Sequence, residues 1–160
     1  MSVQGRTIYI TGATRGIGRT LALACAKRGA KLAICGRDAE LLREITEICR
    51  ETTQVFSQAF DLLQERGVVT FYREATREIG APDVLVNNAG FNHRKAPVAD
   101  VGTEEFDNIL GVNLRAPFLL MRQALPDMVS RGSGHVINVL STVCKHPSFP
   151  FVRDTQSIVR

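Results

Sequence analysis

Residues 11–18 read TGATRGIG, so three glycines lie between a strand-like segment and a segment of helical spacing. Before them, TIYIT at residues 7–11 has the pattern of a short buried strand. After them, apolar residues recur at helical spacing, namely Ile17, Leu21, Ala24 and Cys25. Glycine is needed where a backbone turns tightly or where a pyrophosphate approaches bare N–H groups. A purely structural turn is the alternative, but the position after the first strand favours a nucleotide-binding turn.

Strand-like and helix-like segments alternate outward from this turn. The sequence predicts strands at residues 7–11, 31–35, 55–60, 84–86 and 136–140. It also predicts a helix capped by Asp38, a helix closed by Gly80, and a long helical region that Thr103 caps and that ends near Ser130. This alternation implies right-handed crossovers and an α/β fold, a doubly wound parallel sheet in three layers. Ligands of such sheets bind at the carboxyl ends of the strands.

Composition indicates the class of protein. The chain has 160 residues, of which 44% are hydrophobic and 22% charged, as in a single globular domain. It has no apolar run that would span a membrane and no visible secretory signal, so a cytoplasmic location is expected. The basic residues are scattered, which argues against nucleic-acid binding, and the four cysteines lack metal-ligand spacing. We expect residues 1–144 to form a nucleotide-binding domain without a metal, and residues 145–160 to form an irregular tail.

A second motif narrows the class further. Asn87–Gly90 reads NNAG and follows the fourth predicted strand. With the Gly-x-x-x-Gly-x-Gly spacing of the turn, it resembles the two signatures of the short-chain dehydrogenase/reductase family, classical type. Asn113 and Ser141 fall where that family keeps its catalytic Asn and Ser. The resemblance implies a Rossmann fold that binds a nicotinamide dinucleotide.

The resemblance also implies a role for each matching residue. Asn113 and Ser141 would be catalytic, with the Asn positioning a water in a proton relay and the Ser bonding the substrate oxygen. Asn87 would stabilise the sheet. Asp61 would contact the adenine, and a helix N-cap is its alternative role. The residues implied to contact the cofactor are Gly12, Thr14, Arg15, Gly16, Ile17, Gly18, Arg37, Asp61, Asn88, Ala89 and Gly90.

The tip of the second predicted strand bears on the choice of dinucleotide. NAD-selective relatives place an acidic side chain there for the ribose hydroxyls, whereas this chain has Gly36 and Arg37. Arg37, joined by Arg15, is placed to fork onto a 2′-phosphate. Each arginine could instead be a solvated surface charge, and Asp38 opposes the assignment unless it caps a helix. We expect NADP(H) to be preferred over NAD(H).

The family's acid/base pair is missing from these residues. Relatives move a hydride between nicotinamide and a small-molecule carbonyl or alcohol, with a tyrosine as acid/base and a lysine four residues later. This chain has Tyr9 and Tyr72, and neither is followed by such a lysine. The family spacing from Ser141 leads to Asp154 and Ile158. Either the C-terminus is truncated or altered, or an insertion moves the pair beyond residue 160.

Two functions follow. The chain represents an NADP(H)-dependent oxidoreductase of the short-chain type, or it is a catalytically inactive fragment that binds nucleotide or pairs with a full-length subunit. A methyltransferase on a similar sheet fits less well, because such enzymes usually have an acidic residue at the tip of the second strand, where this chain has Gly36 and Arg37, and they lack the NNAG motif. We expect the sheet to be incomplete at its C-terminal edge, which would uncover strand 136–140, Phe118 and Leu119. A homo-oligomer is one way to cover them.

Overall fold

The computed structural model describes residues 2–91 and 98–141. The strands are β1 (Thr7–Thr11), β2 (Lys31–Gly36), β3 (Val55–Ala59), β4 (Val84–Asn87) and β5 (His135–Asn138). The helices are α1 (Gly16–Ala26), α2 (Ala39–Arg50), α3 (Glu65–Ile79), α4 (Thr103–Leu110) and α5 (Ala116–Ser130). A 3-10 turn, η1 (Val98–Asp100), precedes α4, and a π-helical turn, η2 (Gly111–Arg115), joins α4 to α5. The expected tail at 145–160, with Asp154 and Ile158, lies outside the described residues.

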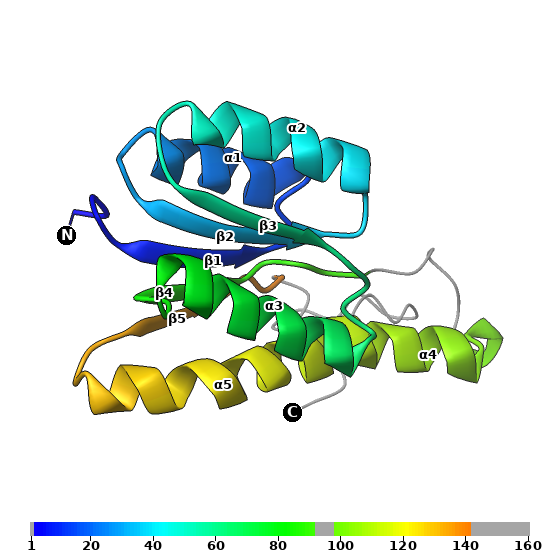
Figure 1. Ribbon diagram of the computed structural model, residues 1–160. Helices are drawn as coiled ribbons and strands as arrows, with labels where there is room; N and C mark the ends of the chain where they lie inside the picture. Colours follow the sequence, from blue (N-terminus) through cyan, green and yellow to red (C-terminus); the bar gives the residue numbers. More distant parts are fainter. Residues whose placement is uncertain (1, 92–97, 142–160) are drawn as a thin grey trace.

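The five strands form one parallel sheet in the order β3-β2-β1-β4-β5. The strand order reverses at β1, because the chain moves outward to β3 and then returns to place β4 on the other side of β1. Figure 1 shows α1 and α2 on one face of the sheet and α3 and α5 on the other. The predicted fold class, a Rossmann-type doubly wound sheet in three layers, is confirmed.

Strand β1 separates two cores. Successive side chains of a strand point to opposite faces. Tyr9 therefore packs with Phe71 and Leu120 beneath α3 and α5, while Ile10 packs with Ile45 beneath α1 and α2. Each of these side chains is buried, and burial of an apolar side chain this large contributes about 1.5–3 kcal/mol. The strand that carries the glycine turn is thus fixed from both sides.

Several element boundaries differ from prediction. The third strand ends at Ala59, and the fifth covers His135–Asn138. Gly102, not Thr103, is the N-cap residue of α4. The predicted long helix is interrupted by the π-helical residues Gly111–Arg115. A π turn occurs as one short turn inside an α-helix, so the helical spacing of the sequence did not distinguish it.

The exposure of apolar side chains differs from prediction at two positions. Ile17 is 66% exposed, because α1 turns small residues such as Ala22 toward the sheet. Leu119 is only 3% exposed, so the expectation that it is uncovered was wrong, whereas Phe118 is 53% exposed as predicted. β5 forms an edge of the described sheet, with Ile137 49% exposed. Within the described ranges, the helices are too short or too polar to cross a membrane.

Candidate functional site

A cleft of about 610 Å³ opens at the carboxyl ends of β1, β2 and β4, where the strand order reverses. Open parallel sheets bind their ligands at this point. Among the residues implied to contact a cofactor, Gly18 does not line the cleft. Those that line it are Gly12, Thr14, Arg15, Gly16, Ile17, Arg37, Asp61, Asn88, Ala89 and Gly90. The fold therefore brings segments that are far apart in the sequence around one space.

Two glycines allow the turn after β1 to pack against the end of β4. Gly12 has a φ of +66°, and a Cβ there would lie 2.8 Å from the Cα of Ala89. A Cβ on Gly18 would lie 2.5 Å from Nδ2 of Asn88 and would also meet the carbonyl oxygen of Gly12. A larger residue at either position would push the turn away from β4. Gly18 thus helps to shape the cleft although it does not line it.

Hydrogen bonds hold the turn in this position. Nδ2 of Asn88 donates to the carbonyl oxygens of Thr11 and Gly12, at 2.9 and 3.1 Å. The hydroxyl oxygen of Thr11 accepts from the backbone N–H groups of Asn88 and Ala89, at 3.1 and 3.0 Å. The side chain of Asn88 therefore fixes the glycine turn, besides lining the cleft.

The first turn of α1 borders the cleft through Arg15, Gly16 and Ile17. No side chain in the described part of the chain caps this end of the helix. The first N–H groups of an α-helix have no acceptor within the helix, and together with the helix dipole they attract anions. A Cβ on Gly16 would meet open space. The donors and the room at this turn fit a pyrophosphate.

The charged residues at the tip of β2 have defined partners. Nη2 of Arg15 lies 3.0 Å from Oδ2 of Asp38. Oδ1 of Asp38 accepts from the backbone N–H of Leu41 at 3.1 Å, so Asp38 caps α2 as predicted. The guanidinium carbon of Arg37 lies 6.0 Å from the centroid of the Phe91 ring. Two guanidinium groups and a helix-capping carboxylate thus surround this side of the cleft.

Asp61 lies in the cleft wall, in the turn after β3. Its Oδ1 accepts from the backbone N–H of Leu63 at 3.0 Å. Helix α3 begins at Glu65 with Gln64 as its N-cap residue, so the alternative role of Asp61 as a helix N-cap was wrong. The carboxylate orders a local turn at the cleft.

Asn113 and Ser141 do not line the cleft. Oδ1 of Asn113 accepts from the backbone N–H of Phe91 at 2.7 Å, and its Nδ2 donates to the carbonyl oxygen of Phe91 at 3.0 Å. Asn113 therefore supports the cleft wall through Phe91, which lines it. Ser141 is exposed and follows Val139, another lining residue, by two positions.

Two side chains close to the strand ends have structural partners. Nδ2 of Asn87 donates to Oδ1 of Asn138 at 2.8 Å and so joins β4 to β5, the stabilising role expected of Asn87. Cys35, at the end of β2, is buried as expected of a core residue. Burial raises the pKa of its thiol to about 12, despite a hydrogen bond with the backbone of Gly12. This thiol stays neutral near pH 7.

Neither tyrosine is placed to act in the cleft. The hydroxyl of Tyr9 donates to the carbonyl oxygen of Gly80 at 3.0 Å, and burial raises its pKa to about 12. The hydroxyl of Tyr72 donates to Oδ2 of Asp127 at 2.7 Å. Burial and this carboxylate raise the pKa of Tyr72 well above its usual range. Among the described residues no three metal-ligating side chains come together.

The sequence interpretation missed several residues of the cleft wall. Phe91 directly follows the NNAG motif. An aromatic residue next to that motif was the sequence signal that could have identified it as a lining residue. Gly36 directly precedes Arg37, and a Cβ there would lie 2.6 Å from Cγ2 of Thr14. The remaining residues carry no distinctive signal, because they are apolar: Phe60, Leu62, Val112 and Val139.

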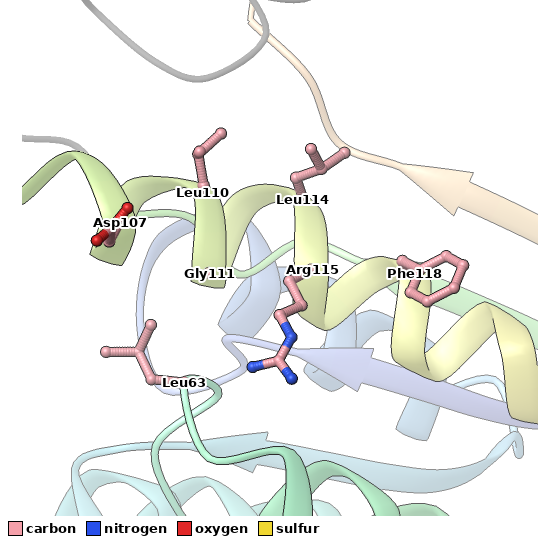
Figure 2. Close-up of a pocket in the computed structure, with 7 residues that line it drawn as sticks. All are labelled: Leu63, Asp107, Leu110, Gly111, Leu114, Arg115 and Phe118. Carbon is pink, nitrogen blue, oxygen red and sulfur yellow. The ribbon is translucent and has the colours of Figure 1, made fainter.

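A second hollow, of about 570 Å³, lies beside α4, η2 and α5 (Figure 2). Its lining residues are Leu63, Asp107, Leu110, Gly111, Leu114, Arg115 and Phe118. Figure 2 shows Leu110 and Leu114 projecting from the same side of the helical segment, with Arg115 directed toward Leu63. None of the predicted site residues belongs to this hollow.

Residues 6–152 match the family model described as short chain dehydrogenase. The chain is 35% identical, over 90% of its own length, to the short chain dehydrogenase tazN of Aspergillus terreus, of which it covers 32%. It is 32% identical, over 87% of its length, to the NADPH-dependent pterin aldehyde reductase of Arabidopsis thaliana, of which it covers 57%. The chain thus spans from about a third to somewhat over half of these relatives.

Solved structures show the same similarity. A metagenomic short-chain oxidoreductase in complex with NADP superposes with a TM-score of 0.84 at 36% identity, over 91% of this chain and 66% of that one. L-sorbose reductase from Gluconobacter frateurii, complexed with NADPH and L-sorbose, superposes with a TM-score of 0.87 at 26% identity, over 98% and 59% of the two chains. Both of these similar proteins are oxidoreductases solved with an NADP(H) cofactor.

Proposed function

Since the chain belongs to the short-chain dehydrogenase family, we propose that its cleft binds NADP(H), in a protein that oxidises or reduces a small-molecule alcohol or carbonyl. The observation that carries the cofactor assignment is the uncapped start of α1 at a cleft that also holds Arg15 and Arg37. The similar proteins solved with NADP and NADPH support the same choice.

Each part of the cleft suits one part of the dinucleotide. The N–H groups at Arg15, Gly16 and Ile17 would bind the pyrophosphate. Arg37, assisted by Arg15, would bind the 2′-phosphate, and Asp61 would lie near the adenine. When bound, the nicotinamide supplies or accepts a hydride. The residues of this chain bind and orient the dinucleotide.

The described residues supply many groups for binding the cofactor but few for the reaction itself. Ser141 would hydrogen-bond the substrate oxygen, and Asn113 would act by holding Phe91 and the cleft wall. Reduction of a carbonyl also needs a proton at its oxygen. The hydroxyls of Tyr9 and Tyr72 are buried and bonded elsewhere. This observation favours a second candidate function for these 160 residues, nucleotide binding or subunit pairing without turnover.

Cofactor titration tests the assignment. We expect the chain to bind NADPH more tightly than NADH, and Arg37→Ala to weaken NADPH binding about tenfold or more, because it removes a charge-assisted hydrogen bond to phosphate. NADH affinity should stay unchanged. Arg43→Ala, an exposed arginine on α2, is the matched control. Equal affinities of wild type and Arg37→Ala for NADPH would contradict the NADP(H) assignment.

The same samples separate the two candidate functions. NADPH oxidation is followed with a panel of ketones, aldehydes and quinones. NADPH binding without oxidation would support nucleotide binding alone, whereas sustained oxidation would show that these residues are sufficient for catalysis.

We also propose that the exposed side of η2 and α5 binds a second subunit. Apolar side chains recur along this side at helical spacing and remain exposed: Leu114, Phe118, Leu125 and Val129. Monomeric proteins rarely expose a continuous apolar stripe of this kind. A second copy of the chain, or a longer subunit of the same fold, would bury it.

A further inference from the structure

Phe91 lies between Asn113 of η2 and Arg37 at the end of β2. Its side chain lines the cleft and packs against the core beneath α3 and α5. Its backbone N–H and carbonyl oxygen are both bonded to the side-chain amide of Asn113, at 2.7 and 3.0 Å. Because both backbone groups of Phe91 are hydrogen-bonded, its ring has a defined position at the cleft.

Arg37 reaches this ring from the end of β2. Its guanidinium carbon lies 6.0 Å from the centroid of the Phe91 ring, at the limit of a cation–π contact. The N–H donors of a guanidinium lie in its plane and point outward from its edge. An arginine that stacks on a ring therefore keeps these donors free for a phosphate.

The other cleft arginine is held differently. Arg15 forms an ion pair with Asp38 at 3.0 Å, so a phosphate that binds Arg15 must compete with that carboxylate. Within residues 2–91 and 98–141, Arg37 has no carboxylate at ion-pair distance, and its guanidinium faces the Phe91 ring. The charge of Arg37 is therefore available to a ligand.

We infer that Phe91 is a positioning residue for phosphate recognition, which holds the Arg37 guanidinium at the cleft so that a 2′-phosphate on an adenosine ribose meets an oriented pair of donors. This inference rests on the proposed binding of NADP(H) in the cleft. Phe91 then increases the preference for the phosphorylated nucleotide without touching the phosphate itself. Its contribution to the affinity for a nucleotide without a 2′-phosphate is small.

Calorimetric titration with two small probes isolates this effect. Adenosine 2′,5′-bisphosphate and adenosine 5′-monophosphate differ only in the 2′-phosphate. We expect Phe91→Leu to weaken binding of the bisphosphate about two- to fivefold, the range of an exposed cation–π contact, and to leave the monophosphate unchanged. Phe91→Tyr, which keeps the aromatic face, should bind both probes as wild type does.

A double-mutant cycle with Arg37→Ala distinguishes positioning from a general packing role. In the Arg37→Ala background, Phe91→Leu should have no further effect on the bisphosphate. Equal weakening of both probes by Phe91→Leu, or a full additional loss in the Arg37→Ala background, would overturn the inference. Thermal melting checks each variant, and Phe91→Met replaces Phe91→Leu in the cycle if the latter does not fold.

The outcomes also separate this inference from the proposed function. If wild type binds neither probe nor NADPH, the proposed cofactor site is wrong and the inference falls with it. If wild type binds the bisphosphate tightly and Arg37→Ala weakens it while Phe91→Leu does not, the cofactor site stands and the role of Phe91 alone is wrong.

Discussion

Gly18 packs against the carbonyl oxygen of Gly12 and the side-chain amide of Asn88, so the closeness of these groups depends on the absence of a side chain. Asn88 in turn bonds the two carbonyls of the turn. The position of the glycine turn is therefore decided by contacts among Gly12 in the β1–α1 connection, Gly18 in α1, and Asn88, which directly follows β4. The effect of a methyl group at Gly18 measures how much the cleft depends on them.

We expect Gly18→Ala to lower the free energy of unfolding by about 1–3 kcal/mol, the usual cost of overpacking, and to weaken NADPH binding because the turn shifts. Urea denaturation and NADPH titration measure the two effects. Gly102→Ala is the matched control for NADPH binding, since a Cβ there meets no atom within 4 Å and Gly102 lies outside the cleft. Wild-type NADPH affinity in Gly18→Ala would refute this account of the turn.

Among the elements, the π-helical turn η2 matters most for the site. It places Asn113 opposite Phe91, with hydrogen bonds to both backbone groups. π turns inside α-helices are frequent at functional sites, where the wider turn displaces one side chain from its usual position. Here that side chain is an amide that pairs with both backbone groups of Phe91. The cleft wall thus depends on η2, whose Val112 also lines the cleft.

Removal of the Asn113 side-chain amide should destabilise the cleft wall at Phe91. We expect Asn113→Ala to destabilise the fold by about 1–3 kcal/mol, because the backbone N–H and carbonyl of Phe91 lose their partner together. Asn113→Asp should also destabilise the fold, since a carboxylate oxygen in place of Nδ2 would face the carbonyl oxygen of Phe91 with no donor between them. Chemical denaturation measures both, with Asn108→Ala on α4 as the control for loss of an asparagine from this helical region. Equal stabilities of Asn113→Ala and Asn108→Ala would show that the pairing with Phe91 contributes nothing.

At the scale of the whole molecule, the outer surface of the α3 and α5 layer carries exposed apolar side chains. Leu114 of η2 and Phe118 of α5 line the second hollow (Figure 2), and both are about half exposed. Arg115, between them, forms an ion pair with Glu65 at 2.5 Å and so keeps its charge beside the apolar surface. This arrangement suits an interface with an apolar centre and a polar rim.

We expect wild type to sediment as a dimer or larger species at micromolar concentrations, and Phe118→Glu to shift it to the monomer, because a charge at the centre of an apolar interface is not solvated. Analytical ultracentrifugation measures the change. Ile48→Glu provides the control, since Ile48 is an exposed apolar residue on α2, in the other helical layer. A monomeric wild type across the whole concentration range would contradict the proposed pairing.

Much of this architecture was predictable because its causes are local. The apolar runs of β1 and β2, the cap at Asp38 and the glycine turn all lie within short windows of sequence. Parallel pairing then follows from the alternation of strands and helices. The glycines mark the turn because few other residues tolerate its backbone. The cleft at the strand ends is a consequence of this topology.

The remaining features depend on contacts between distant residues. The pairing of Arg15 with Asp38 and the contact of Arg37 with Phe91 join elements whose relative placement no local pattern encodes. The π turn at η2 covers five residues inside a longer helical region, too few for periodicity to reveal it. Ile17 satisfied the helical pattern and is nevertheless exposed, because smaller residues of α1 face the sheet.

The hydrogen bonds between Thr11 and Asn88 can form only after both residues have been synthesised. The two residues are 77 positions apart. At a synthesis rate of about 5–20 residues per second, roughly 4–15 s pass between their additions to the growing chain. During that interval the glycine turn has no β4 to hold it, and one edge of β1 is unpaired. The nucleotide can stabilise the nascent protein only after Asn88 has been made, so its binding favours chains that already contain the end of β4.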